Sequence, residues 1–230
     1  MSKRCISLLL LLTSFSILIG SCKKNEIIGS DISFISVYNA SNNATSLNFL
    51  INGESIGASA LTIGQKSLYY GVYEGVWSTE AIPSGTTGKT LVKDLTFVAG
   101  EHNSLFVIGP ADSLDYFTIK DDINVKDPNQ VKIKFLNLSP NAGSLNLEIA
   151  LLGTVTSFPG LGYKQFSDYR SFNAGTIYTL TLKDSVTNNI VGMPVTAEFI
   201  QGKVYTVWAK GSLDATVESE KLGIQISELN

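Results

Sequence analysis

The sequence is poor in the residues on which most enzymes and nucleic-acid-binding proteins depend. Its 230 residues include one histidine, His102, and two cysteines, Cys5 and Cys22. Only 16% of the residues are charged, the formal net charge is -3, and lysine and arginine form no extended basic run. Nucleic-acid binding is disfavoured because phosphate contacts need clustered cations. Most metal and nucleophile chemistries are disfavoured as well, because so few histidines and thiols cannot build them.

The apolar run near the N-terminus is short for a membrane span. It covers residues 6–19 and follows Lys3 and Arg4, whereas a spanning helix takes roughly 20 residues and a signal-peptide core about 7–15. The run ends in Ile19-Gly20-Ser21-Cys22, which resembles the lipobox of bacterial lipoproteins, with isoleucine replacing the usual leucine. The resemblance implies cleavage before Cys22 and a diacylglycerol on its thiol. The alternative is an ordinary cleaved signal peptide followed by an incidental cysteine.

Removal of a signal peptide at residues 1–21 leaves a polar tether at 22–31. The chain after this tether contains two similar copies of one sequence pattern. Gln65-Lys66-Ser67-Leu68-Tyr69 and Gln165-Phe166-Ser167-Asp168-Tyr169 share three identities at an offset of 100 residues. Segment 121–130 is polar and contains Pro128, so it is the expected linker. We therefore predict one domain over 32–120 and a second over 131–230.

Within each copy the apolar pattern has the period of β-strands. Residues 145–149 alternate strictly, and residues 177–182 and 204–208 are rich in β-branched and aromatic side chains. Turn signals such as Asn52-Gly53 recur, and no amphipathic helix of ten residues is evident. The sequence predicts an all-β protein: two tandem Ig-like or transthyretin-like antiparallel β-sandwich domains after a lipoprotein signal peptide.

A family resemblance rests on the second copy. It opens with VKIKFLNLSPNA at 131–142, continues with SLNL at 144–147 and ends with GKVYTVWAKG at 202–211. These segments resemble the family called domain of unknown function 4397, which is typical of exported lipoproteins from Bacteroidota. The first copy is a poorer match, because Tyr38-Asn39-Ala40-Ser41 stands where the Ser-Pro-Asn-Ala turn is expected. The resemblance implies an all-β fold and a cell-envelope location, and it implies no activity.

The same resemblance bears on localisation. A lipid on Cys22 would anchor the protein to the outer membrane. Surface-exported lipoproteins of this group often carry several acids after the cysteine, whereas Lys23-Lys24-Asn25-Glu26 has one. We therefore expect the periplasmic face rather than the cell surface.

Two features that resemble catalytic or phosphate sites are better explained otherwise. Pro83-Ser84-Gly85-Thr86-Thr87-Gly88-Lys89-Thr90 resembles a P-loop but has proline in place of the first glycine, so a polar hairpin turn is the favoured interpretation. His102 lies beside Glu101, yet zinc sites need three or four ligands, and we expect a solvated turn histidine. The sequence predicts no catalytic residues, no cofactor and no enzyme activity.

The linker acids leave a calcium site as an alternative. Asp121, Asp122, Asn124 and Asp127 offer oxygen ligands, but their spacing is not that of an EF-hand loop. A solvated acidic linker is the favoured interpretation, and no metal site is assigned.

Aromatic and serine residues supply the remaining candidates. Tyr69 and Tyr169 align between the copies and are predicted as ligand-surface residues, with core packing as the alternative. Trp77 and Trp208 are expected in the core. Ser113 and Ser185 each follow an aspartate, in a pattern that resembles the O-glycosylation motif of Bacteroidota exported proteins.

The sequence therefore favours a non-catalytic, lipid-anchored cell-envelope protein. We expect a binding or adhesion module that meets a polymer, such as a glycan, or a protein partner on an exposed surface. The alternative is a structural spacer or assembly component without a soluble ligand, and an enzyme is a distant third.

Overall fold

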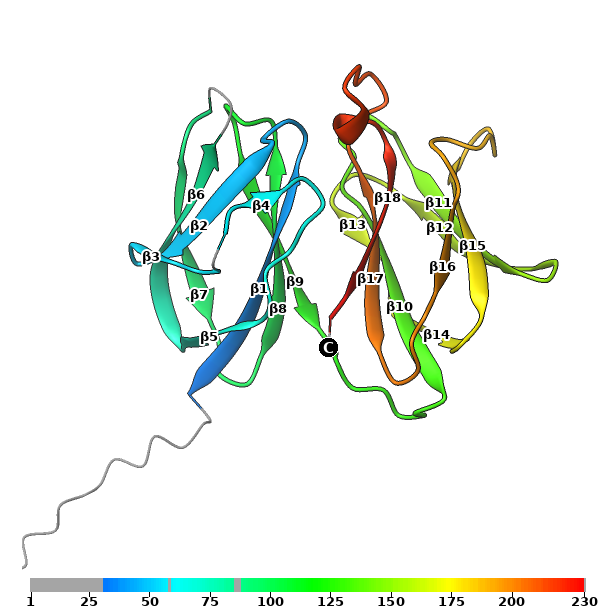
Figure 1. Cartoon of the computed structure of the whole chain (residues 1–230), viewed down its shortest axis with the longest axis horizontal. Helices are drawn as coiled ribbons and strands as arrows, with labels where there is room; N and C mark the ends of the chain where they lie inside the picture. The colour runs from blue at the N-terminus through cyan, green and yellow to red at the C-terminus, as the bar shows by residue number, and fades with distance from the viewer. Residues whose placement is uncertain (1–30, 58, 85–87, 230) are drawn as a thin grey trace, which may run out of the picture. The chain divides into compact units, whose positions relative to one another are not determined.

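The computed structural model describes residues 31–57, 59–84 and 88–229, which belong to one compact unit beginning at Asp31. The all-β prediction is confirmed: a short 3-10 helix, η1 (Glu218–Glu220), is the only helical element in this part of the chain (Figure 1). No helix among these residues is long and apolar enough to cross a membrane. The predicted signal peptide and Cys22 lie outside the described residues.

The first copy forms two sheets whose strands all come from residues 32–121. One sheet has the order β5-β1-β8-β9 and the other β3-β2-β6-β7, with β4 also paired to β2. The strands are β1 (Ile32–Ser41), β2 (Ser46–Ile51), β3 (Glu54–Ser55), β4 (Leu61–Thr62), β5 (Tyr70–Tyr73), β6 (Gly75–Ser84), β7 (Leu91–Phe97), β8 (His102–Gly109) and β9 (Asp115–Asp121).

The second copy repeats this arrangement within residues 130–228. Its sheets have the orders β13-β10-β17-β18 and β12-β11-β15-β16, and β14 also pairs with β10. The strands are β10 (Gln130–Asn137), β11 (Leu145–Leu151), β12 (Thr154–Leu161), β13 (Gln165–Phe166), β14 (Arg170–Asn173), β15 (Ile177–Asp184), β16 (Val195–Glu198), β17 (Val204–Lys210) and β18 (Gly223–Glu228). No sheet of the described residues combines strands from both copies.

Two of the four sheets are mixed rather than fully antiparallel. β1 pairs with β8 in parallel, with Val37 opposite Leu105, and β10 pairs with β17 in parallel, with Phe135 opposite Val207. Parallel neighbours need a long crossover connection. Here the whole second sheet of each copy lies between the two strands in sequence. The antiparallel prediction therefore fails for these two pairs, and the Ig-like or transthyretin-like assignment stays a prediction.

Each pair of sheets encloses its own apolar core. In the first sandwich, alternate residues such as Val37, Phe49 and Leu105 point between the sheets. In the second, Phe135, Leu147 and Leu180 do so. This alternation is the pattern that identified the strands in the sequence.

A third apolar cluster joins the opposite faces of the two mixed sheets. Tyr38 of β1 stacks on Phe106 of β8 with ring centroids 4.3 Å apart, and Phe106 meets Trp208 of β17 at 5.8 Å. Strands β1, β8 and β17 are consequently buried on both faces along most of their length. Trp208 is fully buried, as predicted, and Trp77 is half-buried and packs against the core of the first sandwich.

A candidate binding pocket lined by aromatic side chains

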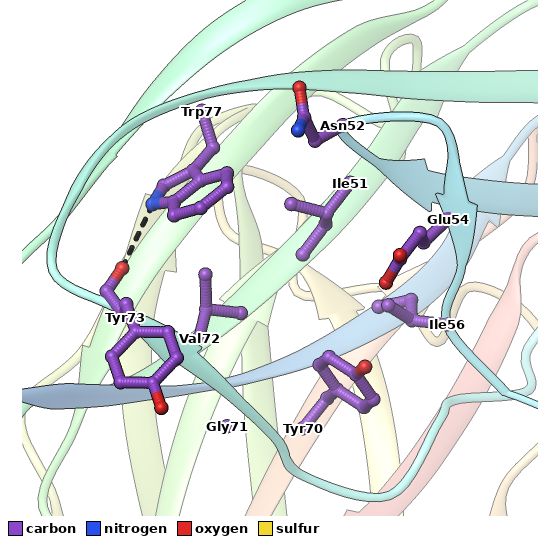
Figure 2. Close-up of a pocket in the computed structure, with 9 residues that line it drawn as sticks. All are labelled: Ile51, Asn52, Glu54, Ile56, Tyr70, Gly71, Val72, Tyr73 and Trp77. Atoms are coloured by element: carbon purple, nitrogen blue, oxygen red, sulfur yellow. Dashed lines mark hydrogen bonds between the residues drawn. The ribbon is translucent and has the colours of Figure 1, made fainter.

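A shallow pocket of about 320 Å³ lies on the first sandwich where the β2–β3 hairpin meets β5 and the start of β6 (Figure 2). The hairpin turn places Asn52 and Gly53 at φ values of 51° and 81°, the left-handed conformation that two-residue hairpins require and that Asn-Gly adopts readily. Its tight reversal brings the polar side chains of Asn52 and Glu54 to the pocket. The lining residues are Ile51, Asn52, Glu54, Ile56, Tyr70, Gly71, Val72, Tyr73 and Trp77.

Two aromatic side chains, those of Tyr70 and Trp77, flank an aliphatic floor in this pocket. Tyr70 is 43% exposed and lies on the face of β5 that carries Val72, whereas Tyr73 pairs with Ile32 on the opposite face and is 53% exposed. The Trp77 indole Nε1–H donates a hydrogen bond of 2.9 Å to the Tyr73 carbonyl oxygen, and this bond fixes the indole beside β5. Figure 2 shows Trp77 and Tyr73 on one side of Ile51 and Val72, with Tyr70 on the other.

The pocket combines flat apolar faces with hydrogen-bonding groups. The rings offer apolar surface, and the Glu54 carboxylate, the Asn52 amide and the tyrosine hydroxyls offer acceptors and donors. An apolar lining with few polar groups is the usual composition of a small-molecule site. The arrangement suits a ligand that has one apolar face and a polar rim, and it contains no nucleophile–base pair.

The second sandwich has a pocket in the matching place, and its lining includes the aromatic residues Phe172 and Tyr178. It measures about 410 Å³ and lies beside the Leu152-Gly153 turn, whose φ values of 48° and 86° match those of Asn52-Gly53. Tyr73 pairs with the first residue of β1 and Asn173 with the first residue of β10, so Arg170 and Asn173 are equivalent to Tyr70 and Tyr73. The Tyr178 hydroxyl donates a hydrogen bond of 2.9 Å to the Asn173 carbonyl oxygen, as the Trp77 indole does to the Tyr73 carbonyl oxygen, so Tyr178 is equivalent to Trp77. The fold therefore forms without an aromatic side chain at the positions of Tyr70 and Tyr73, whereas both copies have one at the position of Trp77.

The predicted ligand-surface residues Tyr69 and Tyr169 lie elsewhere. Both rings are half-buried and pack against the third apolar cluster. The Tyr69 hydroxyl donates a hydrogen bond of 2.7 Å to the Asp121 carboxylate, and the ammonium of Lys134 lies 4.2 Å from the Tyr169 ring centroid. The open aromatic platform expected at these two positions is not present, and their placement favours the core-packing alternative.

Asp121 is the centre of a buried polar network rather than part of a solvated linker. Its side chain accepts hydrogen bonds of 2.7 Å from both Tyr69 and Ser104. Burial raises the pKa of the Asp121 carboxyl, although these hydrogen bonds and the charge of Lys134 act in the opposite direction. Burial also raises the pKa of Tyr69, as does the neighbouring Asp121 charge, and burial lowers the pKa of Lys134. The solvated-linker prediction is therefore wrong for Asp121.

The other linker acids make local contacts. Asp122 forms an ion pair with Lys132, and an Asp127 carboxylate oxygen accepts a hydrogen bond of 2.9 Å from the Asn129 N–H. Among the described residues, no group of three histidine, cysteine or acidic side chains is placed to hold a metal ion.

His102 does not lie in the turn expected for it, and the segment at 83–90 is not followed by the helix of a P-loop. His102 begins β8 instead of lying in a solvated turn, its ring stacks on Phe34 at 4.7 Å, and burial lowers its pKa. The segment at 83–90 is followed by strand β7, so it lacks the helix that a P-loop requires. The predicted hairpin-turn interpretation agrees with that strand.

The two candidate O-glycosylation serines lie in turns. Ser113 is exposed between β8 and β9, and its N–H bonds the Pro110 carbonyl oxygen at 2.9 Å. Ser185 is half-buried directly after β15, where its N–H bonds the Ser144 carbonyl oxygen at 2.9 Å. Modification at either serine stays a prediction.

The fold and the pocket define an all-β protein of two repeated sandwiches with an aromatic pocket on the first. The chain belongs to the family described as Domain of unknown function (DUF4397), whose model matches residues 33–148. The match covers the first copy and only the opening of the second, although the sequence segments suggested the clearer resemblance in the second copy. No curated protein matches this chain in sequence.

Two solved structures are distantly similar. The Bacillus anthracis TIE protein is 11% identical, with a TM-score of 0.28, over 86% of this chain and 44% of its own. A leucine-rich repeat protein from Bacteroides thetaiotaomicron is 12% identical, with a TM-score of 0.19, over 84% of this chain and 27% of its own. The chain thus spans less than half the length of either protein, and TM-scores this low do not establish a shared fold.

Proposed function

We propose that this chain is a non-catalytic binding module of the cell envelope. In this proposal a lipid on Cys22 anchors it to the outer membrane, on the periplasmic face, and the pocket around Tyr70, Tyr73 and Trp77 receives the ligand. The location rests on the lipobox resemblance, and the binding role rests on the pocket.

The difference between the two copies is the observation that carries the binding role. Both sandwiches build the same hairpin and the same edge strand, so the second serves as an internal control for what the fold needs. Arg170 and Asn173 fill the positions equivalent to Tyr70 and Tyr73 there. Stability therefore gives no reason for the first copy to expose Tyr70 and Tyr73. Exposed aromatic groups around a hollow are instead a feature of interaction sites.

A structural spacer is the second candidate, and the third apolar cluster supports it. Tyr38, Phe106 and Trp208 lie in that cluster with essentially no exposed surface, so the two sandwiches are held together by more than the linker. A spacer role makes no use of the aromatic pocket, and the following experiment separates the two proposals.

The test compares two matched variants of the full chain. Tyr70→Ala removes the exposed ring that distinguishes the two pockets, and Arg170→Ala changes the equivalent position in the second copy. Each purified form is passed over immobilised envelope polymers, with thermal melts as a folding control. We expect the first variant to lose retention and the second to keep it. Equal retention by both folded variants would contradict the binding role of this pocket.

A further inference from the structure

A second hollow adjoins the aromatic pocket and shares Ile56 and Tyr70 with it. It measures about 390 Å³ and continues from Tyr70 toward Leu68, which is 85% exposed. Its lining residues are Ile56, Gly57, Ser59, Leu61, Lys66, Ser67, Leu68, Tyr69 and Tyr70. Because Ile56 and Tyr70 border both hollows, the two are direct neighbours and together make a candidate site with two compartments.

The dimensions of this site favour a chain of repeated units over a single compact molecule. Each hollow has a volume in the few-hundred-Å³ range of a small-ligand pocket. Both lie on the surface of the same sandwich, along β5 and the segment before it. A ligand with one unit in each hollow would contact the Tyr70 ring from both sides.

The charges along the site favour a neutral ligand. Glu54 is exposed at the aromatic pocket, and Lys66 lines the adjoining hollow. An anionic chain would place negative charge against Glu54, and a cationic chain would place positive charge against Lys66. The Lys66 ammonium also lies in the field of Glu228 and Asp121, so it does not offer an uncompensated positive charge to an anion.

We infer that the ligand of the proposed binding site is an uncharged polysaccharide, with consecutive sugar units on either side of Tyr70. A sugar ring has an apolar C–H face that packs on an aromatic ring, and hydroxyl groups at its rim that bond carboxylate and amide side chains. Tyr70 and Trp77 supply the first kind of contact, and Asn52 and Glu54 supply the second. This inference rests on the proposed function and specifies its ligand.

A peptide added to the edge of the sheet is the competing occupant. β5 is an edge strand and offers backbone groups for such pairing. However, β14 likewise pairs with only one strand, β10, in the second copy. An available edge is thus common to both copies, whereas an aromatic ring at the position of Tyr70 is confined to the first, since the second copy has Arg170 there. That ring favours a sugar chain over a peptide strand.

The experiment measures binding of the full chain to three series of probes. The first series contains neutral gluco- and manno-oligosaccharides of one to six units. The second contains oligosaccharides with uronic acids or amino sugars, and the third contains extended peptides. Each series is repeated with Tyr70→Ala and with the matched control Arg170→Ala, and thermal melts verify folding.

We expect affinity for a neutral series to rise by about two- to tenfold between one unit and three, the range that one further aromatic contact provides. Tyr70→Ala should remove this rise, and Arg170→Ala should keep it. Tyr70-dependent binding of a charged oligosaccharide or a peptide instead would overturn the ligand class and leave the proposed pocket intact. Binding that is independent of Tyr70, or no binding in any series, would overturn both.

Discussion

The Tyr69 hydroxyl donates a 2.7 Å hydrogen bond to the Asp121 carboxylate across 52 positions of sequence. The bond ties the segment before β5 to the last residue of β9, at the edge of the third apolar cluster. Ser104 donates a second bond of 2.7 Å to the same oxygen. Two donors on one buried carboxylate oxygen make this network a structural element of the first sandwich.

Removal of the Tyr69 hydroxyl should therefore destabilise the protein. Tyr69→Phe keeps the ring but leaves the buried Asp121 carboxylate with one donor fewer, which costs about 1–3 kcal/mol. Tyr169→Phe is the matched control, because it removes a hydroxyl at the aligned position and leaves both described donors to Asp121 in place. Urea unfolding of the two variants checks this. Equal losses of unfolding free energy would argue against a special role for the Tyr69–Asp121 bond.

The pH dependence of stability gives a second check on Asp121. Burial raises its pKa in the folded state above the usual value of about 3.9. The folded protein thus binds this proton more tightly than the unfolded chain does. The resulting stabilisation is fully present below the unfolded pKa and is lost as the pH rises through the folded pKa.

Asp121→Asn removes this titration. When the pH is raised from 4 to 7, the unfolding free energy of the variant should therefore rise relative to that of the original protein. Comparing the two proteins cancels the contributions of the other carboxylates. Urea unfolding at both pH values measures the difference, and parallel pH profiles would show that Asp121 titrates as it does in the unfolded chain.

Trp208 should be the more important of the two tryptophans for stability. It is fully buried in the third apolar cluster, against Phe106. We expect Trp208→Ala to lower the unfolding free energy by about 3–5 kcal/mol, and Trp77→Ala to lower it by less, because Trp77 is half-buried. Chemical denaturation ranks them, and the reverse order would mean that the third cluster adds little.

Much of the fold follows from the sequence because each copy alternates apolar and polar residues over short segments. Residues 145–149 are an example, and they form the first part of β11, which runs to Leu151. The parallel pairing of β1 with β8 was not predictable in this way, because a period of two identifies a strand but not its neighbour. The third cluster was missed because Tyr38 and Phe106 lie on faces that one isolated sandwich would expose to solvent.

In the candidate site, the tyrosines proposed to meet the ligand are those that do not recur in both copies. Tyr69 and Tyr169 were selected because they align, yet residues that recur in both copies serve what both copies share, which is the fold. Tyr70 and Tyr73 have no aromatic counterpart in the second copy, where Arg170 and Asn173 take their places. That lack of repetition, together with the Asn52-Gly53 turn, was the sequence signal that marks the pocket.

The anchoring prediction concerns Cys22, outside the described residues. We expect Cys22→Ala to abolish labelling by a metabolic fatty-acid probe and to leave an uncleaved precursor or a soluble exported form. Cys5→Ala is the matched control, because that cysteine lies in the predicted signal peptide. Fatty-acid labelling that persists in Cys22→Ala would contradict the lipobox assignment.

The central claim, that the aromatic pocket binds the ligand, is tested most directly by tryptophan fluorescence. The chain has two tryptophans, one in the pocket and one fully buried in the third cluster. Titration of the original protein with a neutral oligosaccharide should shift the emission and protect Trp77 from acrylamide quenching. The same titration of a folded Trp77→Phe variant should leave the emission of Trp208 unchanged. A ligand-dependent change that persists in Trp77→Phe would place binding elsewhere and contradict the account.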